Sequence, residues 1–341
     1  MRAAKALSVG RGAGKLRAAG GAELALKGRA LTQIWKAFKE LNPKNLAAEA
    51  ARPVRMGVVG SIELLQQTAT YMLTSDTAAF DKAGDTLILI PTPLDSAAFG
   101  LLPRCDVVLV SAEAVQSLPG VATERLFTFS SADDLPRVID DILARQEVAY
   151  AHIPLARALP AFRAKAAIQT IQSVSIENAV FVTSTSLGNI IPNPLQPLAS
   201  VAESVGDTVV LTANQIRMLF RLAAIFDREL GLKQQSPEVL SIVGAAFGWR
   251  SIARELVSKV PFGGGVVPKA AIAFAGTWAI GDGIAFYYKT GRRLTKAELR
   301  QRFDLAMEKG KASAELIVGK LRKTYSGGKD KPGEEPMKLL E

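Results

Sequence analysis

The stretch VRMGVVG at residues 54–60 decides the fold class, because it is the first of four short runs rich in apolar and β-branched residues. The other three are TLILI at 86–90, DVVLV at 106–110 and LFTF at 126–129. Helical patterns separate them, most clearly at 62–73 and 133–144. Nearly continuous apolar strands joined by helical crossovers predict a doubly wound parallel sheet covered on both faces.

Helical patterns replace strand patterns from residue 159 onward. TANQ at 212–215 and TKAE at 295–298 have the spacing of capping boxes that open helices, and a Pro- and Ser-rich passage at 182–200 is typical of a connector. We therefore expect an α/β domain followed by an all-α bundle. The predicted divisions are a basic arm with an amphipathic helix (1–52), the α/β domain (53–148), the all-α domain (149–324) and a disordered tail (325–341).

The composition excludes several common kinds of functional site. The chain has 341 residues, 48% of them apolar, with one cysteine (Cys105) and one histidine (His152). These counts exclude a disulfide framework, a Cys/His zinc site and a His-rich catalytic cluster. We expect Cys105 in the core and His152 in a loop, and we predict no cofactor, no metal and no catalytic residue.

Positive charge is concentrated at the start of the chain. Residues 1–55 contain twelve Lys/Arg and three Glu, a net +9 of the formal +10. Such an arm attracts anionic surfaces, either phospholipid headgroups or nucleic-acid phosphates, and salt weakens the attraction. A merely solvated basic tail is the plain alternative.

The arm contains an amphipathic helical pattern at 24–41, with Trp35 and Phe38 on the apolar stripe and Lys36 and Lys39 beside it. These four residues are candidate contacts to a membrane or a partner, and docking on the protein's own core is the alternative. Nucleic acid is the weaker candidate partner, because regular aromatic interleaving is absent. Since no long apolar run follows the basic opening, we expect the cytoplasmic side of a membrane, with an organelle transit peptide as a minor alternative.

A phosphate-binding loop would begin after the first strand, but Gly60 is followed by Ser61-Ile62-Glu63. The loop needs a Gly-Lys-Ser/Thr ending, and Glu63 has the wrong charge for phosphate. The run GAGKL at 12–16 resembles part of this motif, but we do not expect it to bind phosphate, since no strand precedes it. If a nucleotide binds nonetheless, Ser61 and Thr92 would be its nearest contacts.

The next two strands resemble those of GTPases. LILIPTP at 87–93 sits where GTPases have a strand ending in Asp-Thr-Pro-Gly, and CDVVLV at 105–110 resembles their following strand. Pro91 replaces the metal-linked aspartate, and no Asn-Lys-x-Asp element occurs. The resemblance implies a degenerate, pseudo-GTPase domain, and an unrelated doubly wound domain is the alternative.

A second resemblance covers about residues 159–291. Its motifs are residues 169–179, Leu211-Thr212-x-x-Gln215-x-x-Met218, Pro261-x-Gly263-Gly264, Gly276-Thr277-x-Ala279-Ile280-Gly281, Tyr288 and Gly291. As an ordered set they resemble a helical domain-of-unknown-function family found behind bacterial Era- and Der-type GTPases and in stand-alone inner-membrane proteins. The resemblance implies a GTPase-associated, often membrane-attached module without a known activity.

Two hydrophobic helices, expected at 237–259 and 268–289, would form a hairpin. Gly263 and Gly264 would form its turn, and Gly276, Thr277 and Gly281 would let helices pack closely.

Antiparallel pairing in this hairpin would bring Asp282 within a turn of Arg250, a candidate buried ion pair, and a solvent-facing Asp282 is the alternative. Whether lipid or protein surrounds the hairpin stays open, because its uncharged core is short for a span.

These observations predict a non-enzymatic, membrane-associated interaction or scaffold protein, peripheral or partly embedded. Its expected partners are an anionic membrane surface and a partner protein such as a GTPase. The alternative is a GTP-binding regulatory protein with an atypical phosphate loop.

Overall fold

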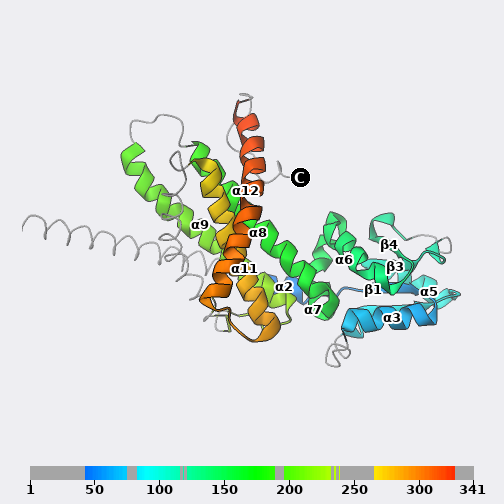
Figure 1. Cartoon of the computed structure of the whole chain (residues 1–341). Coiled ribbons are helices and arrows are strands. Elements are labelled where there is room, and N and C mark those ends of the chain that lie inside the picture. The colour runs from blue at the N-terminus through cyan, green and yellow to red at the C-terminus, as the bar shows by residue number, and fades with distance from the viewer. Residues whose placement is uncertain are drawn as a thin grey trace, which may run out of the picture.

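The computed structural model describes residues 43–74, 83–115, 118, 121–188, 196–231, 234, 235, 238 and 265–326. The strands are β1 (Met56–Gly60), β2 (Leu87–Pro91), β3 (Val107–Ser111) and β4 (Leu126–Phe129). The helices are α2 (Pro43–Ala50), α3 (Ile62–Leu73), α5 (Ser96–Leu101), α6 (Leu135–Ala144), α7 (His152–Ala158), α8 (Pro160–Gly188), α9 (Gln196–Ile225), α11 (Val266–Thr290) and α12 (Lys296–Ser326). Short 3₁₀ segments lie at Leu102–Arg104, Thr123–Arg125, Ala132–Asp134 and Gln146–Ala151. The predicted α/β region followed by a helical region is confirmed (Figure 1).

The four strands form one parallel sheet in the order β2-β1-β3-β4. Val58 in β1 lies opposite Leu89 in β2 and Leu109 in β3. Every residue of β1 and β3 is buried, which is why these runs are apolar without a break. The predicted strands are therefore all present, each within a residue or two of its expected position.

Alternate residues of each central strand enter different cores. Met56 and Val58 belong to a core shared with α3 and α6, whereas Val59 packs with Val108 and Val110 on the opposite face. The opposite face is covered by α5 and by the loops around it. Two-sided burial of this kind is the property that distinguishes a parallel α/β sheet.

The larger core continues from the sheet into the helices. It joins residues of the sheet to Leu155 in α7, Phe162 in α8 and Leu219 in α9, all three fully buried. Because α8 contacts both α3 and α6, the junction near residue 148 is packed rather than an open linker.

Helix α11 is the centre of the helical region and contacts α8, α9 and α12. It is joined to α12 by residues 291–295, and the two helices lie side by side (Figure 1). The hairpin partner expected at 237–259 lies outside the described residues except for Glu238, and so does the turn at Gly263 and Gly264. In the described structure the hairpin partner of α11 is α12.

One local prediction is wrong. Thr212 and Gln215 do not cap a helix, because they lie buried in the middle of α9, which runs without a break from Gln196 to Ile225. Pro43 begins α2, where a proline at the first position removes no helical hydrogen bond. The capping box at Thr295 and Glu298 is confirmed, since the side chain of each accepts from the backbone N–H of the other.

Candidate functional site

The first candidate site is the crevice at the carboxyl ends of β1 and β3. In doubly wound sheets, ligands bind at this edge where the strand order reverses, and here β1 has β2 on one side and β3 on the other. A cleft of about 300 Å³ lies there. Its lining comprises Ser61, Glu63, Leu64, Gln67, Ser111, Ala112, Glu113, Ser130 and Ser131.

The charge of this crevice is negative. Glu63 and Glu113 are both solvent-exposed carboxylates in its lining, and the described lining contains no Lys or Arg. The Ser61 hydroxyl caps α3 by accepting from the Leu64 N–H at 3.3 Å. A triphosphate here would meet two carboxylates and a hydroxyl already engaged in the fold.

Of the two phosphate contacts considered from the sequence, the structure brings only Ser61 to the crevice. Thr92 follows β2, where its backbone N–H donates to the Gly60 carbonyl at 3.0 Å, and it is absent from the cleft lining. Glu113 is the lining residue that the sequence reasoning missed. Its signal was its place two residues after the third strand, at the same sheet edge as Ser61.

Cys105 and His152 take structural places. Cys105 is 1% exposed, and burial raises the pKa of its thiol, so its core placement is confirmed. His152 is not a loop residue: it begins α7, its Nε2 lies 2.9 Å from the Ile142 carbonyl oxygen, and burial lowers its pKa. Among the described residues, no cluster of His, Cys, Asp or Glu could hold a metal ion.

The helical region contains a buried polar cluster that the sequence reasoning missed. Thr277 in α11 accepts hydrogen bonds from Asn178 Nδ2 at 2.8 Å and Gln215 Nε2 at 3.3 Å. Asn178 Oδ1 in turn accepts from Asn214 Nδ2 at 2.8 Å. Asn178 and Thr277 are essentially inaccessible to solvent. The cluster therefore joins α8, α9 and α11 through buried polar groups that satisfy one another's hydrogen bonds.

The predicted close-packing glycines differ in their surroundings. A Cβ added to Gly281 would lie 2.8 Å from Ile171 Cγ1 and 2.9 Å from Met218 Sδ, so this glycine does allow close packing. A Cβ on Gly276 would meet no described atom within 4 Å, so close packing does not require a glycine there. The tightest backbone approach involves Gly310 in α12, where a Cβ would lie 2.8 Å from the Ala271 carbonyl oxygen.

Asp282 pairs with Arg302 of α12. Both side chains are 31% exposed, and the Arg302 guanidinium also lies 5.1 Å from the centre of the Phe286 ring. The expected partner, Arg250, lies outside the described residues. Because α12 packs along α11, Arg302 of this following helix neutralises the Asp282 carboxylate at a partly exposed position. The predicted pair with Arg250 stays a prediction.

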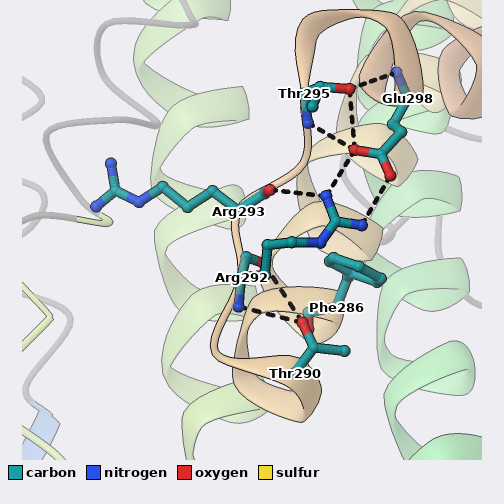
Figure 2. Close-up of polar contacts among 6 residues, drawn as sticks. All are labelled: Phe286, Thr290, Arg292, Arg293, Thr295 and Glu298. Atoms are coloured by element: carbon teal, nitrogen blue, oxygen red, sulfur yellow. Dashed lines mark hydrogen bonds and ion pairs between the residues drawn. The ribbon is translucent and has the colours of Figure 1, made fainter.

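The turn between α11 and α12 is fixed by polar contacts (Figure 2). Arg292 donates from both terminal nitrogens to the Glu298 carboxylate, at 2.9 and 2.8 Å, and its guanidinium stacks 4.7 Å from the centre of the Phe286 ring. The backbone N–H and the hydroxyl of Thr295 also donate to Glu298, at 2.8 and 2.9 Å. The Arg292 and Thr295 donors lower the pKa of the Glu298 carboxyl to about 2.

Replacing Glu298 by Gln should lower the melting temperature at pH 7. A carboxyl whose pKa is lower in the folded state stabilises the fold above its ordinary pKa of 4.5, and this stabilisation disappears as the pH falls through about 2. The difference between wild type and Glu298→Gln should therefore shrink below pH 4.5 and vanish near pH 2.

Thermal unfolding followed by circular dichroism across this pH range measures the effect. Glu308→Gln makes the same charge change at an exposed pair with Lys311 and serves as the control. An equal, pH-independent effect of both substitutions would contradict the assignment.

One described helix, α11, is long and apolar enough to cross a membrane. Only 44% of its most apolar window is buried within the protein. The helix also packs along α12, where many of the exposed residues are charged. The candidate contacts Trp35, Phe38, Lys36 and Lys39 lie outside the described residues.

Comparison with known proteins identifies no relative. No family model matches the chain, and neither the curated proteins nor the solved structures contain a match. The fold and the charges of its clefts are therefore the observations that bear on the class of this protein.

Proposed function

We propose that this chain is a non-enzymatic interaction protein that attaches peripherally to the cytoplasmic side of an anionic membrane. Its α/β domain would act as a folded platform derived from a nucleotide-binding fold, and its helical region would be the scaffold for partners, among them a GTPase. The observation that carries the proposal is the pair of carboxylates, Glu63 and Glu113, at the crevice where a nucleotide phosphate would lie.

Charge distribution supports the membrane part of the proposal. The first 55 residues hold +9 of the formal charge of +10, and each basic group that reaches an anionic surface contributes about 1 kcal/mol. The apolar character of α11 is compatible with a membrane location. If α11 crossed the bilayer, the charged residues of α12, which packs along it, would enter the hydrocarbon core. A position of α11 at the membrane surface avoids this cost.

The full chain should sediment with phosphatidylcholine vesicles that contain about a quarter phosphatidylglycerol, and binding should fall steeply as salt is raised. A chain lacking residues 1–41, which leaves α2 intact, should be released. Pure phosphatidylcholine vesicles control for nonspecific adhesion, and Trp35→Ala with Phe38→Ala tests the apolar anchor separately from the charge. Equal binding by the full and shortened chains would reject the arm as the attachment site.

A calorimetric titration of the full chain with GTP or GDP in the presence of magnesium should give no saturable heat, and no hydrolysis should be measurable. Because the described lining of the crevice has two carboxylates and no Lys or Arg, the phosphate charges would lack compensation from the protein. Saturable binding that Ser61→Ala abolishes would instead establish the alternative, a GTP-binding regulatory protein. Glu124→Ala, at an exposed site away from the cleft lining, is the matched surface control.

A further inference from the structure

The crevice at the carboxyl ends of β1 and β3 contains a buried hydroxyl that the fold does not use. Ser111, the last residue of β3, lines this crevice and is only 7% exposed. Its hydroxyl forms no hydrogen bond in the part of the chain that the structure describes. Buried hydroxyl groups normally have a partner, because leaving them unpaired costs free energy. The unused hydroxyl of Ser111 therefore indicates a ligand in the crevice.

The Ser111 side chain points into this crevice. Val107 and Leu109 of the same strand enter the core shared with α3 and α6. Because side chains alternate along a strand, Ser111 lies on this same face of the sheet, at the end of the strand. Its Cβ would lie 3.6 Å from a Cβ placed on Gly60, at the start of α3. The missing side chain of Gly60 therefore leaves room beside the hydroxyl.

Two carboxylates border the same crevice. Glu63 in the first turn of α3 and Glu113 after β3 are exposed lining residues. The Glu113 carboxylate forms no ion pair or hydrogen bond with another described residue. Glu63 accepts one long hydrogen bond, from Gln67 Nε2 at 3.5 Å. Both charges are therefore available to a ligand, and the described lining contains no Lys or Arg that would offset them.

A third carboxylate occupies backbone donors that an anion would need. The N–H groups of Ser130 and Ser131 both donate to Asp134, at 2.7 and 3.2 Å. Arg137 lies 4.0 Å from Asp134 and pairs more closely with Asp141, at 2.9 Å. The side chains of the crevice thus offer a ligand two carboxylates and a buried hydroxyl, all of which can accept hydrogen bonds. A positively charged hydrogen-bond donor suits these groups best.

We propose that this crevice binds a guanidinium group. A guanidinium has five N–H donors in one plane and a permanent positive charge, so it can bridge carboxylates and a hydroxyl that surround it. A divalent metal ion fits less well, because no cluster of three His, Cys, Asp or Glu side chains occurs among the described residues. The crevice volume of about 300 Å³ accommodates a guanidinium on a short alkyl chain. The source is either a free guanidinium compound or the arginine side chain of a partner protein.

Calorimetric titration of the full chain with butylguanidinium and with butylurea, its neutral analogue, provides the test. Butylguanidinium should bind saturably and butylurea should not, because only the first is attracted by the carboxylates. Glu113→Gln should weaken butylguanidinium binding about tenfold, since a hydrogen bond between two charged groups is lost. Glu124→Gln makes the same change at an exposed site before β4, outside the crevice lining, and should leave binding unchanged.

Ser111→Ala separates a role of the hydroxyl in binding from a role in folding. Because this hydroxyl has no partner within the described chain, its removal should leave the urea unfolding midpoint nearly unchanged. Butylguanidinium binding should nonetheless weaken about threefold. Ser175→Ala is the matched control, since that buried hydroxyl donates to the Ile171 carbonyl of its own helix at 2.7 Å, far from the crevice lining. No saturable binding by the wild type, or undiminished binding by both Ser111→Ala and Glu113→Gln, would overturn the proposal.

A blocked pentapeptide with one arginine among alanines distinguishes the two sources. Saturable peptide binding that Glu113→Gln weakens would assign the crevice to an arginine of a partner protein. Exclusion of the peptide, with butylguanidinium still bound, would assign it to a free compound.

A guanidinium ligand adds to the non-enzymatic function proposed above, and the same titrations keep the two apart. Saturable binding of GTP without binding of butylguanidinium would overturn both. Binding of neither compound would overturn only the guanidinium site.

Discussion

Replacing Gly310 by Ala should destabilise the protein by about 1–3 kcal/mol, the usual effect of overpacking a close contact. A methyl group on Gly310 would lie 2.8 Å from the Ala271 carbonyl oxygen and 3.2 Å from Phe274 Cδ1. A backbone carbonyl cannot move aside as a flexible side chain can, so α11 and α12 must separate. This separation would also loosen the contacts of Phe274, which is 2% exposed.

The same helix provides a matched control at Gly319. This residue is exposed, and a Cβ there would meet no described atom within 4 Å. Gly319→Ala should therefore stabilise the protein by up to about 1 kcal/mol through helix propensity alone. Urea unfolding of both variants measures the two effects. If Gly310→Ala were as stabilising as Gly319→Ala, the close approach of α11 and α12 would be wrong.

The sheet could be predicted from sequence because its signal is local. A strand buried on both faces must be apolar throughout, and β1 and β3 show this within five residues each. The edge strands β2 and β4 are only partly buried, but their short apolar runs are also local signals. The order β2-β1-β3-β4 required more than local pattern. It follows from the packing of crossover helices on both faces, which depends on how the whole region folds.

The helical contacts could not be predicted as well, because they join residues far apart in the chain. Glycine spacing selected Gly276 and Gly281, but only the arrangement of α11 against its neighbours shows that Gly281 and Gly310 face other atoms closely and that Gly276 does not. Likewise, the charge of Asp282 signalled a need for a partner without indicating α12 as its source.

The charge of the sheet crevice could be predicted only in part. Glu63 comes three residues after the end of β1, so the sequence could signal that the crevice is unsuited to phosphate. Glu113 comes from a different segment and reaches the same crevice because β1 and β3 are parallel neighbours, which the local sequence does not show.

The buried polar cluster should produce the largest loss of stability on a conservative change. Thr277→Val keeps the shape of the side chain but removes the oxygen that accepts from Asn178 Nδ2 and Gln215 Nε2.

Each of the two buried donors left without an acceptor costs about 1–3 kcal/mol, so a loss of about 2–6 kcal/mol is expected. Thr185→Val should change stability by less than about 0.5 kcal/mol, because that hydroxyl donates only to the Val182 carbonyl of its own helix and is partly exposed.

A double-mutant cycle tests whether the cluster acts as a unit. In Thr277→Val the Asn178 Nδ2 donor has lost its acceptor, and Asn178→Leu removes that donor. The double variant should therefore lose less stability than the sum of the two single losses. Free energies of unfolding from urea titration provide all the required values. Strictly additive losses, or a Thr277→Val protein as stable as Thr185→Val, would show that these side chains do not depend on one another. Apolar packing, rather than the buried polar cluster, would then hold α8, α9 and α11 together.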